Sequence, residues 1–304
     1  MLNSGQSTMR TATMISLVLT LVTAGCGGGS GVQRAQGSVQ ARAPKILSVA
    51  IQQEPAAFFG FGELGGASRT VAGGSANPSK ILHEGLVSKN ERGEFEPRLA
   101  TEGISVERGT WRANPDGTME TIWKLRPNAR WHDGAAFSSA DLLFSFNLRK
   151  DPEIAVSTIA GGRWDLIESA SAPDPTTFIL RWSSVYVRAN EATDTEPYPS
   201  HLLSELYARD KGAFVNSPYF STEFVGLGPY MLDRWEQGSH MELARFDGYF
   251  LGAPSLDRII IRFIADPSAM VANILSGTID LVLPTGVGLE TASEVKRRWE
   301  GTGN

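Results

Sequence analysis

The chain of 304 residues contains one cysteine, and after residue 31 it has no apolar run long enough to cross a membrane. A single cysteine excludes an internal disulfide framework, and a membrane-spanning helix needs about 20 apolar residues. Lysine and arginine do not gather in long runs and the net charge is −5, so nothing in the sequence indicates the basic surface typical of nucleic-acid binding. The hydrophobic share of 41% is ordinary for a globular protein.

Motifs for catalysis and metal binding are also scarce. None of the four histidines is spaced with another histidine, a cysteine or a carboxylate as a metal site requires. His132-Asp133 is the one suggestive pair, and we favour a turn-forming Asp-Gly beside an imidazole. The chain has no Gly-x-Ser-x-Gly elbow. The residues therefore indicate no enzyme, no metal and no cofactor.

Gly60, Gly62 and Gly65 have the spacing of a dinucleotide-binding fingerprint. That fingerprint joins a strand directly to a helix, so that the pyrophosphate meets the helix N-terminus. Here Pro55 separates the glycines from the preceding strand-like run, and residues 66–74 lack a helical pattern. We therefore interpret this segment as a surface loop, not as a nucleotide site.

Cys26 follows a short apolar run that begins at Met14 and is preceded by Arg10. About a dozen apolar residues after a basic residue are typical of a secretory signal peptide. A cysteine at the cleavage point resembles a bacterial lipoprotein, and the alternative is a secreted protein with a stray cysteine. We predict a signal peptide over 1–25, a lipid anchor on Cys26 with a flexible linker over 26–44, and a periplasmic or cell-surface location.

Strand and helix patterns are mixed irregularly after residue 45. A capping box at Ser138–Asp141 and an Asp266-Pro267 start predict two helices, and Gly277 is suited to end the second one. The turn at 114–117 predicts a hairpin over 111–125. This mixture predicts a mixed α/β (α+β) fold and not a simple doubly wound sheet. A short helix is predicted at 78–86, and further strands at 46–51, 178–182, 230–235, 241–246, 258–264 and 280–283.

Five stretches, in order, resemble the family 5 extracellular solute-binding proteins of ABC transporters, which include oligopeptide, dipeptide and nickel receptors. Each stretch is weak alone, and their order and spacing make the resemblance specific from about residue 45 to the C-terminus. They are His83–Asn90 with Leu99–Glu102, Trp111–Phe146 with Trp131-His-Asp-Gly134, Tyr198–Leu203, Val225–Tyr230 with Tyr249–Leu256, and Ser276–Asp280.

The resemblance implies a fold like that of type II periplasmic binding proteins, in which two lobes close on a ligand by a hinge motion. Residues 45–283 would form lobe I with an inserted subdomain, and 284–304 would begin lobe II. It also implies a monomer that captures peptides or similar small solutes and delivers them to a membrane permease without chemistry. The alternatives are a ligand-sensing or partner-binding module of the same fold, and an exported enzyme.

The chain is much shorter than a member of the family. We therefore expect lobe II to be truncated, either because this is a fragment or because a second polypeptide completes it. Such a chain would close poorly over a ligand, so calorimetry with mixed peptides should show little heat. It would also expose apolar surface where the missing parts pack.

The resemblance places candidate ligand contacts in two segments. The loop after the first strand contributes Glu54, Phe58 and Phe59, and the passage between the lobes contributes Thr285. Glu54 could pair with a positive amino group of a ligand, or it could be an exposed surface carboxylate. The sequence leaves both alternatives open.

Overall fold

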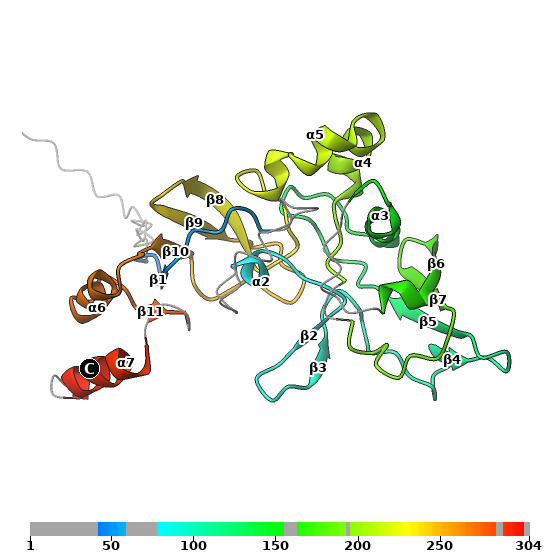
Figure 1. Ribbon diagram of the computed structural model, residues 1–304, viewed down its shortest axis with the longest axis horizontal. Coiled ribbons are helices and arrows are strands. Elements are labelled where there is room, and N and C mark those ends of the chain that lie inside the picture. The colour runs from blue at the N-terminus through cyan, green and yellow to red at the C-terminus, as the bar shows by residue number, and fades with distance from the viewer. Residues whose placement is uncertain (1–41, 59–77, 155–162, 193–194, 284–287, 301–304) are drawn as a thin grey trace, which may run out of the picture. The chain divides into compact units, whose positions relative to one another are not determined.

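The computed structural model describes residues 42–58, 78–154, 163–192, 195–283 and 288–300 (Figure 1). The chain divides into two units, Met1–Arg42 and Ala43–Asn304, and every element described below belongs to the second. The predicted signal peptide, Cys26 and nearly all of the predicted linker lie outside the described residues. Within the described ranges, no helix combines the length and the apolar character that a membrane span requires.

One sheet of five strands has the order β11-β1-β10-β9-β8. β1 pairs in parallel with both β10 and β11, whereas β9 is antiparallel to its neighbours β10 and β8. Strands from the two ends of the described chain therefore lie side by side, and the strand predictions are confirmed to within one or two residues. The strands are β1 (Ile46–Ile51), β8 (Tyr230–Glu236), β9 (His240–Arg245), β10 (Arg258–Phe263) and β11 (Leu281–Val282).

Alternation along the central strands gives this sheet a buried face. We call the cluster on that face the five-stranded-sheet core; it also takes in Phe58, Leu82 and aromatic side chains from residues 198–230. The opposite face is covered beside β1, where Ala50 packs with helices α6 (Pro267–Leu275) and α7 (Leu289–Glu300). The strand residues of the five-stranded-sheet core are Val49, Ile51, Tyr230, Met241, Leu243, Ile259 and Ile261.

Helix α6 (Pro267–Leu275) begins and ends as its sequence predicts. The Asp266 carboxylate accepts a hydrogen bond of 2.7 Å from the Ala269 amide, and Pro267 occupies the first turn. Gly277 follows the helix with a φ of +73°, a conformation that glycine adopts without strain. Met270 and Ile274 face the sheet, and Val295 of α7 (Leu289–Glu300) joins them.

A second sheet, antiparallel and of four strands, has the order β4-β5-β7-β6. β4 (Trp111–Ala113) and β5 (Met119–Lys124) form the predicted hairpin, and β5 shows the expected alternation of buried and exposed residues. β7 (Thr177–Trp182) pairs with β5, and β6 (Ile167–Asp174) forms the far edge. In the chain, this sheet lies between β1 and β8.

The buried side of this second sheet forms the four-stranded-sheet core, in which Trp123 and Trp131 are fully buried. Helix α3 (Ser139–Lys150) contacts β6 and β7. Its predicted capping box is confirmed, because Asp141 accepts a hydrogen bond of 3.0 Å from the Ser138 amide and the Ser138 hydroxyl caps the helix. The buried Asp141 carboxylate also accepts hydrogen bonds from Ser200, and so joins α3 to the start of α4.

The remaining elements are short. Helix α2 ends earlier than predicted, because His83 is extended, with φ −147° and ψ 153°, where the sequence pattern predicts a helix to Leu86. The side chain of His83 is bound to distant backbone, which gives the physical reason for the early end. These elements are α2 (Ser79–Leu82), β2 (Val87–Lys89), β3 (Phe95–Pro97), α4 (Ser200–Arg209) and α5 (Lys211–Val215), with 3₁₀ turns at Trp164–Leu166 and Pro218–Phe220.

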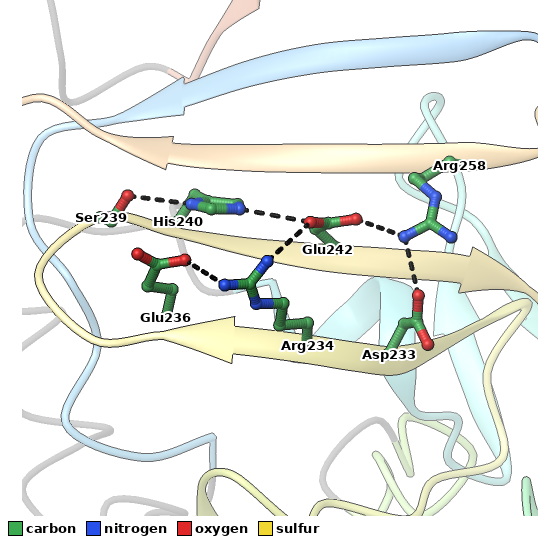
Figure 2. A network of polar contacts seen from close by, with 7 residues as sticks. All are labelled: Asp233, Arg234, Glu236, Ser239, His240, Glu242 and Arg258. Atoms are coloured by element: carbon green, nitrogen blue, oxygen red, sulfur yellow. Dashed lines mark hydrogen bonds and ion pairs between the residues drawn. The ribbon is translucent and has the colours of Figure 1, made fainter. Parts of the chain in front are cut away.

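Charged side chains link β8, β9 and β10 across the face opposite the five-stranded-sheet core (Figure 2). Arg258 donates to Asp233 at 2.7 Å and also to Glu242, which lies between them on β9. Arg234 donates to Glu236 at 2.6 Å and lies 3.9 Å from Glu242. Partly exposed pairs of this kind contribute little individually to the free energy of folding. Because the network connects three neighbouring strands, we assign it to holding these strands in register.

The assignment of the two sheet faces can be tested with neighbouring isoleucines of β10. Ile261 is fully buried, whereas Ile260 lies on the opposite, partly exposed face. Truncation of a buried isoleucine to alanine removes packing and leaves a cavity, at a cost of about 2–5 kcal/mol. We expect Ile261→Ala to lower the free energy of unfolding in urea by that amount and Ile260→Ala to lower it by less than half as much. Equal losses would contradict the assigned faces.

Candidate functional site

The carboxyl ends of β1, β10 and β11 meet at one edge of the five-stranded sheet, because these strands are parallel. The turn between β8 and β9 reaches the same edge, since His240 pairs with Arg262 near the end of β10. Ligands of open sheets with parallel strands bind outside such carboxyl ends. We define the sheet edge as Gln52–Glu54, Glu236–His240, Ile264–Asp266 and Leu283.

Glu54 is bound to the β8–β9 hairpin at this edge. Its Oε1 accepts a hydrogen bond of 2.6 Å from the Trp235 indole, and its Oε2 accepts one of 2.8 Å from the Gly238 amide. Beside it, the Gln52 amide donates to the Ala265 carbonyl at 3.3 Å. Glu54 is thus partly buried and has partners within the chain, an arrangement that neither of the two sequence alternatives foresaw.

Phe58 lies in the five-stranded-sheet core and is 1% exposed. Its ring centroid is 5.1 Å from those of both Phe224 and Trp235, and its amide donates to the Phe220 carbonyl at 2.8 Å. This placement gives the side chain a packing role. Phe59 and Thr285 lie outside the described residues, and ligand contact by any of the four predicted residues stays a prediction.

The loop Val225–Gly228 passes so close to α2 that no side chain fits at two of its positions. A Cβ atom on Gly226 would lie 2.0 Å from the Leu82 carbonyl oxygen, and one on Gly228 would lie 2.4 Å from the Leu82 carbonyl carbon. The Gly228 amide instead donates to the Leu82 carbonyl at 3.0 Å. Glycine is therefore required here for close approach of two backbones.

His132 binds this loop at two points. Its Nδ1 accepts a hydrogen bond of 3.1 Å from the Gly226 amide, and its Nε2 lies 3.0 Å from the Gly228 carbonyl. Because an amide N–H can only donate and a carbonyl can only accept, the imidazole must be neutral with its proton on Nε2. Burial lowers the pKa of His132 to about 4, which agrees with the neutral form.

His83 makes the same kind of contact with the next residue of the loop. Its Nδ1 accepts from the Leu227 amide at 3.1 Å, and its Nε2 lies 2.8 Å from the Pro197 carbonyl. The pKa of His83 is also lowered to about 4, chiefly by burial. We call His83 and His132, with the loop that they bind, the histidine clasp.

The His132-Asp133 pair is part of a turn, as predicted. Asp133 Oδ1 accepts from the Ala135 amide at 3.0 Å, and Oδ2 lies 2.7 Å from Nε2 of His201. No sequence pattern assigned a role to His83, because the Leu227 amide and the Pro197 carbonyl that bind its ring are far away in the sequence. The sequence offered two signals for these residues: His83 lies near the end of a short helix, and His132 lies before an Asp-Gly turn.

The buried carboxylate of Glu84 joins the first and the fourth of the five stretches by a second set of contacts. Arg98 donates from both Nε and Nη2 to Glu84, with a shortest distance of 2.6 Å. The Tyr249 hydroxyl donates to the same carboxylate at 2.6 Å. Burial and the neighbouring Glu84 raise the pKa of Tyr249, so this hydroxyl stays protonated. The charge of Glu84 is thus compensated by a guanidinium and a hydroxyl, as a buried carboxylate requires.

The histidine clasp connects both hydrophobic cores to the sheet edge. Leu227 is fully buried in the four-stranded-sheet core, and Phe224 lies in the five-stranded-sheet core. Two residues after the loop, Tyr230 begins β8, which carries Trp235 to Glu54. The position of the hairpin at the edge therefore depends on the clasp.

Comparison with known proteins identifies the family. A model described as "Bacterial extracellular solute-binding proteins, family 5 Middle" matches residues 94–298, which is more than half of the chain. The chain belongs to this family. The resemblance carried by the five sequence stretches is therefore confirmed, and the stretches His83–Asn90 and Val225–Tyr230 of this family 5 protein meet in the histidine clasp.

Curated relatives are similar to part of the chain. A putative ABC transporter peptide-binding protein of Brucella ovis is 27% identical over 171 residues, which are 56% of this chain and 31% of the relative. Di/tripeptide-binding protein 2 of Pseudomonas aeruginosa is 26% identical over 258 residues, which are 78% of this chain and 44% of the relative. This family 5 chain thus spans about a third to under half of these relatives.

Solved structures show the same fold. NikZ from Campylobacter jejuni, in complex with Ni(L-His), matches with a TM-score of 0.62 and 25% identity, over 79% of this chain and 44% of that one. An oligopeptide-binding protein from Thermus thermophilus, complexed with a pentapeptide, matches with a TM-score of 0.66 and 19% identity, over 81% and 45%. The predicted mixed α/β fold, like that of type II periplasmic binding proteins, is confirmed. The proposed boundary at residue 283 stays a prediction.

The close approach at Gly226 can be tested by adding one methyl group. Gly226→Ala and Gly228→Ala should each lower the free energy of unfolding by at least about 2 kcal/mol, because overpacked backbone must move. Gly103→Ala is the matched control, since a Cβ there would meet no atom within 4 Å; its effect should stay within about 0.5 kcal/mol. Urea unfolding measures all three, and a stable Gly226→Ala variant would contradict the described packing.

The two histidines predict a pH dependence of stability. Their pKa values are lowered to about 4 in the folded state, against about 6.5 when unfolded. Below pH 6.5 the unfolded chain binds more protons, so stability is full above that pH and falls as the pH drops to 4, by up to about 3 kcal/mol per histidine. Urea unfolding of the wild type and of His132→Gln between pH 4 and 7 checks this. The variant should lose part of the slope; an unchanged slope would contradict a buried neutral His132.

Proposed function

We propose that this chain provides a solute-binding lobe of an ABC transporter receptor, which captures peptides or similar small solutes outside the cytoplasmic membrane and delivers them to a permease. The observation that carries the proposal is the parallel pairing of β1 with β10 and β11, which brings three carboxyl ends to one edge. Membership of a family of extracellular solute-binding proteins supports this role.

We propose peptides as the first class of ligand to test. Relatives are named as peptide-binding, dipeptide-binding and di/tripeptide-binding proteins. One similar solved structure holds a nickel complex of histidine, which shares an amino group and a carboxylate with a peptide. The sheet edge offers groups of the kind that such solutes need, including the side-chain amide of Gln52, which also donates to the Ala265 carbonyl, and exposed backbone at Gly238, whose N–H donates to Glu54.

We propose that the protein binds its ligand without changing it. Relatives are named as binding proteins, and the carboxylate of the sheet edge that contacts the hairpin, Glu54, is engaged by two N–H donors. A monomer that acts by capture alone is the simplest form of such a receptor.

We propose that Cys26 anchors the protein by a lipid after export, in the periplasm or at the cell surface. The apolar run from Met14 to Cys26 supports this anchor. A tether raises the concentration of a receptor near its permease. Incorporation of labelled palmitate, and its loss in Cys26→Ala, tests the anchor.

The described residues supply one wall of the proposed site. Binding sites usually enclose most of a small ligand, so one wall gives weak affinity, with a Kd on the order of millimolar. We expect tri-L-alanine, titrated in NMR, to shift backbone signals of the sheet edge and to remain uncleaved. Shifts confined to the four-stranded sheet would contradict the proposed site, and cleavage of the peptide would favour an exported enzyme.

A further inference from the structure

We propose that Glu54 is a positioning residue: its carboxylate ties the loop after β1 to the β8–β9 hairpin and so fixes the sheet edge, instead of serving as the counter-ion of a ligand's amino group. The relevance of this edge to ligands rests on the proposed function. The tie itself is a property of the chain without ligand, so it can be tested without one.

Both carboxylate oxygens of Glu54 are used within the chain. Oε1 accepts from the Trp235 indole at 2.6 Å and Oε2 from the Gly238 amide at 2.8 Å. Hydrogen bonds to a charged acceptor are shorter and stronger than neutral ones. Within the described ranges, no lysine, arginine or histidine forms an ion pair with Glu54, so its charge is stabilised by these N–H donors.

The two donors occupy positions that determine the placement of the β8–β9 hairpin. Gly238 has a φ of +75° and forms the turn between β8 and β9. The Trp235 ring packs on Phe58, so the same loop is held at Glu54 by charge and at Phe58 by apolar contact. Removal of the carboxylate would leave the indole and the amide without this acceptor and would free the tip of the hairpin.

A carboxylate offers about four lone-pair sites, and the two N–H donors bind one on each oxygen of Glu54. An ammonium group at the remaining sites would share the negative charge with these donors and would so weaken the tie between the loop and the hairpin. The geometry therefore assigns recognition at this edge to its other polar groups and to exposed backbone. A substitution of Glu54 should therefore reduce the response to a peptide equally, whether the peptide's amino terminus is charged or not.

The tie is tested by NMR on protein labelled with ¹⁵N-tryptophan and ¹⁵N-glycine, without ligand. Gln has one acceptor where Glu has two, so Glu54→Gln cannot satisfy both the Trp235 indole and the Gly238 amide. We expect the indole N–H signal of Trp235, assigned with Trp235→Phe, to shift in Glu54→Gln, because the indole loses its charged acceptor. Exchange of the Gly238 amide should accelerate at least about tenfold, because a hydrogen bond to a charged group contributes about 1.5–3 kcal/mol.

Glu236→Gln is the matched control, because Glu236 lies on the same hairpin and its carboxylate accepts from Arg234. It should leave both signals unchanged. A Trp235 indole signal that keeps its position in Glu54→Gln would overturn the proposal. So would an unchanged exchange rate of the Gly238 amide in Glu54→Gln.

A second arm separates this inference from the proposed function. Tri-L-alanine and N-acetyl-tri-L-alanine are titrated into the wild type and Glu54→Gln. A positioning role predicts the same fold loss of response for both peptides, whereas a selective loss for the free amine would overturn it. If neither peptide shifts the edge signals of the wild type, the proposed site fails, and the spectra without ligand still decide the role of Glu54.

Discussion

Backbone packed against backbone, with no space for a side chain, is the constraint on which the rest of this structure depends. The Val225–Gly228 loop lies against Leu82 and is bound by two neutral histidines. Leu227 of this loop and Phe224, which directly precedes it, enter different hydrophobic cores, and the same loop leads into β8. Loss of the close approach would therefore affect both cores and the sheet edge together.

The segments that mark the family serve mainly to join parts of the fold. His83 and Glu84 bind the loop and Arg98, and Tyr249 completes the buried group around Glu84. None of these contacts involves a residue of the sheet edge at which we propose that solutes bind. We therefore expect proteins with this architecture to bind different ligands. The contacts that join the parts of the fold can stay the same while the residues at the binding edge change.

The sequence predicted best what is encoded locally. The alternation of β5, the capping box at Ser138 and the Asp-Pro start of α6 all depend on neighbours in the chain. β6 was missed because its residues are small and polar and only Ile167 is buried; α4 was missed although Leu203 and Leu206 have helical spacing. The early end of α2 and the partners of Glu54 depend on residues far away in sequence, which no local pattern reveals. Of the segments that form the sheet edge, only the loop after β1 was predicted from the sequence.

Native-state hydrogen exchange of the Gly226, Leu227 and Gly228 amides tests the central claim most directly, because these amides donate to His132, His83 and Leu82. If the histidine clasp holds the fold together, these amides exchange only when the whole molecule unfolds. Their opening free energies then equal the free energy of unfolding in urea. Exchange by local opening, at much lower free energy, while the strands of both sheets stay protected, would contradict the account.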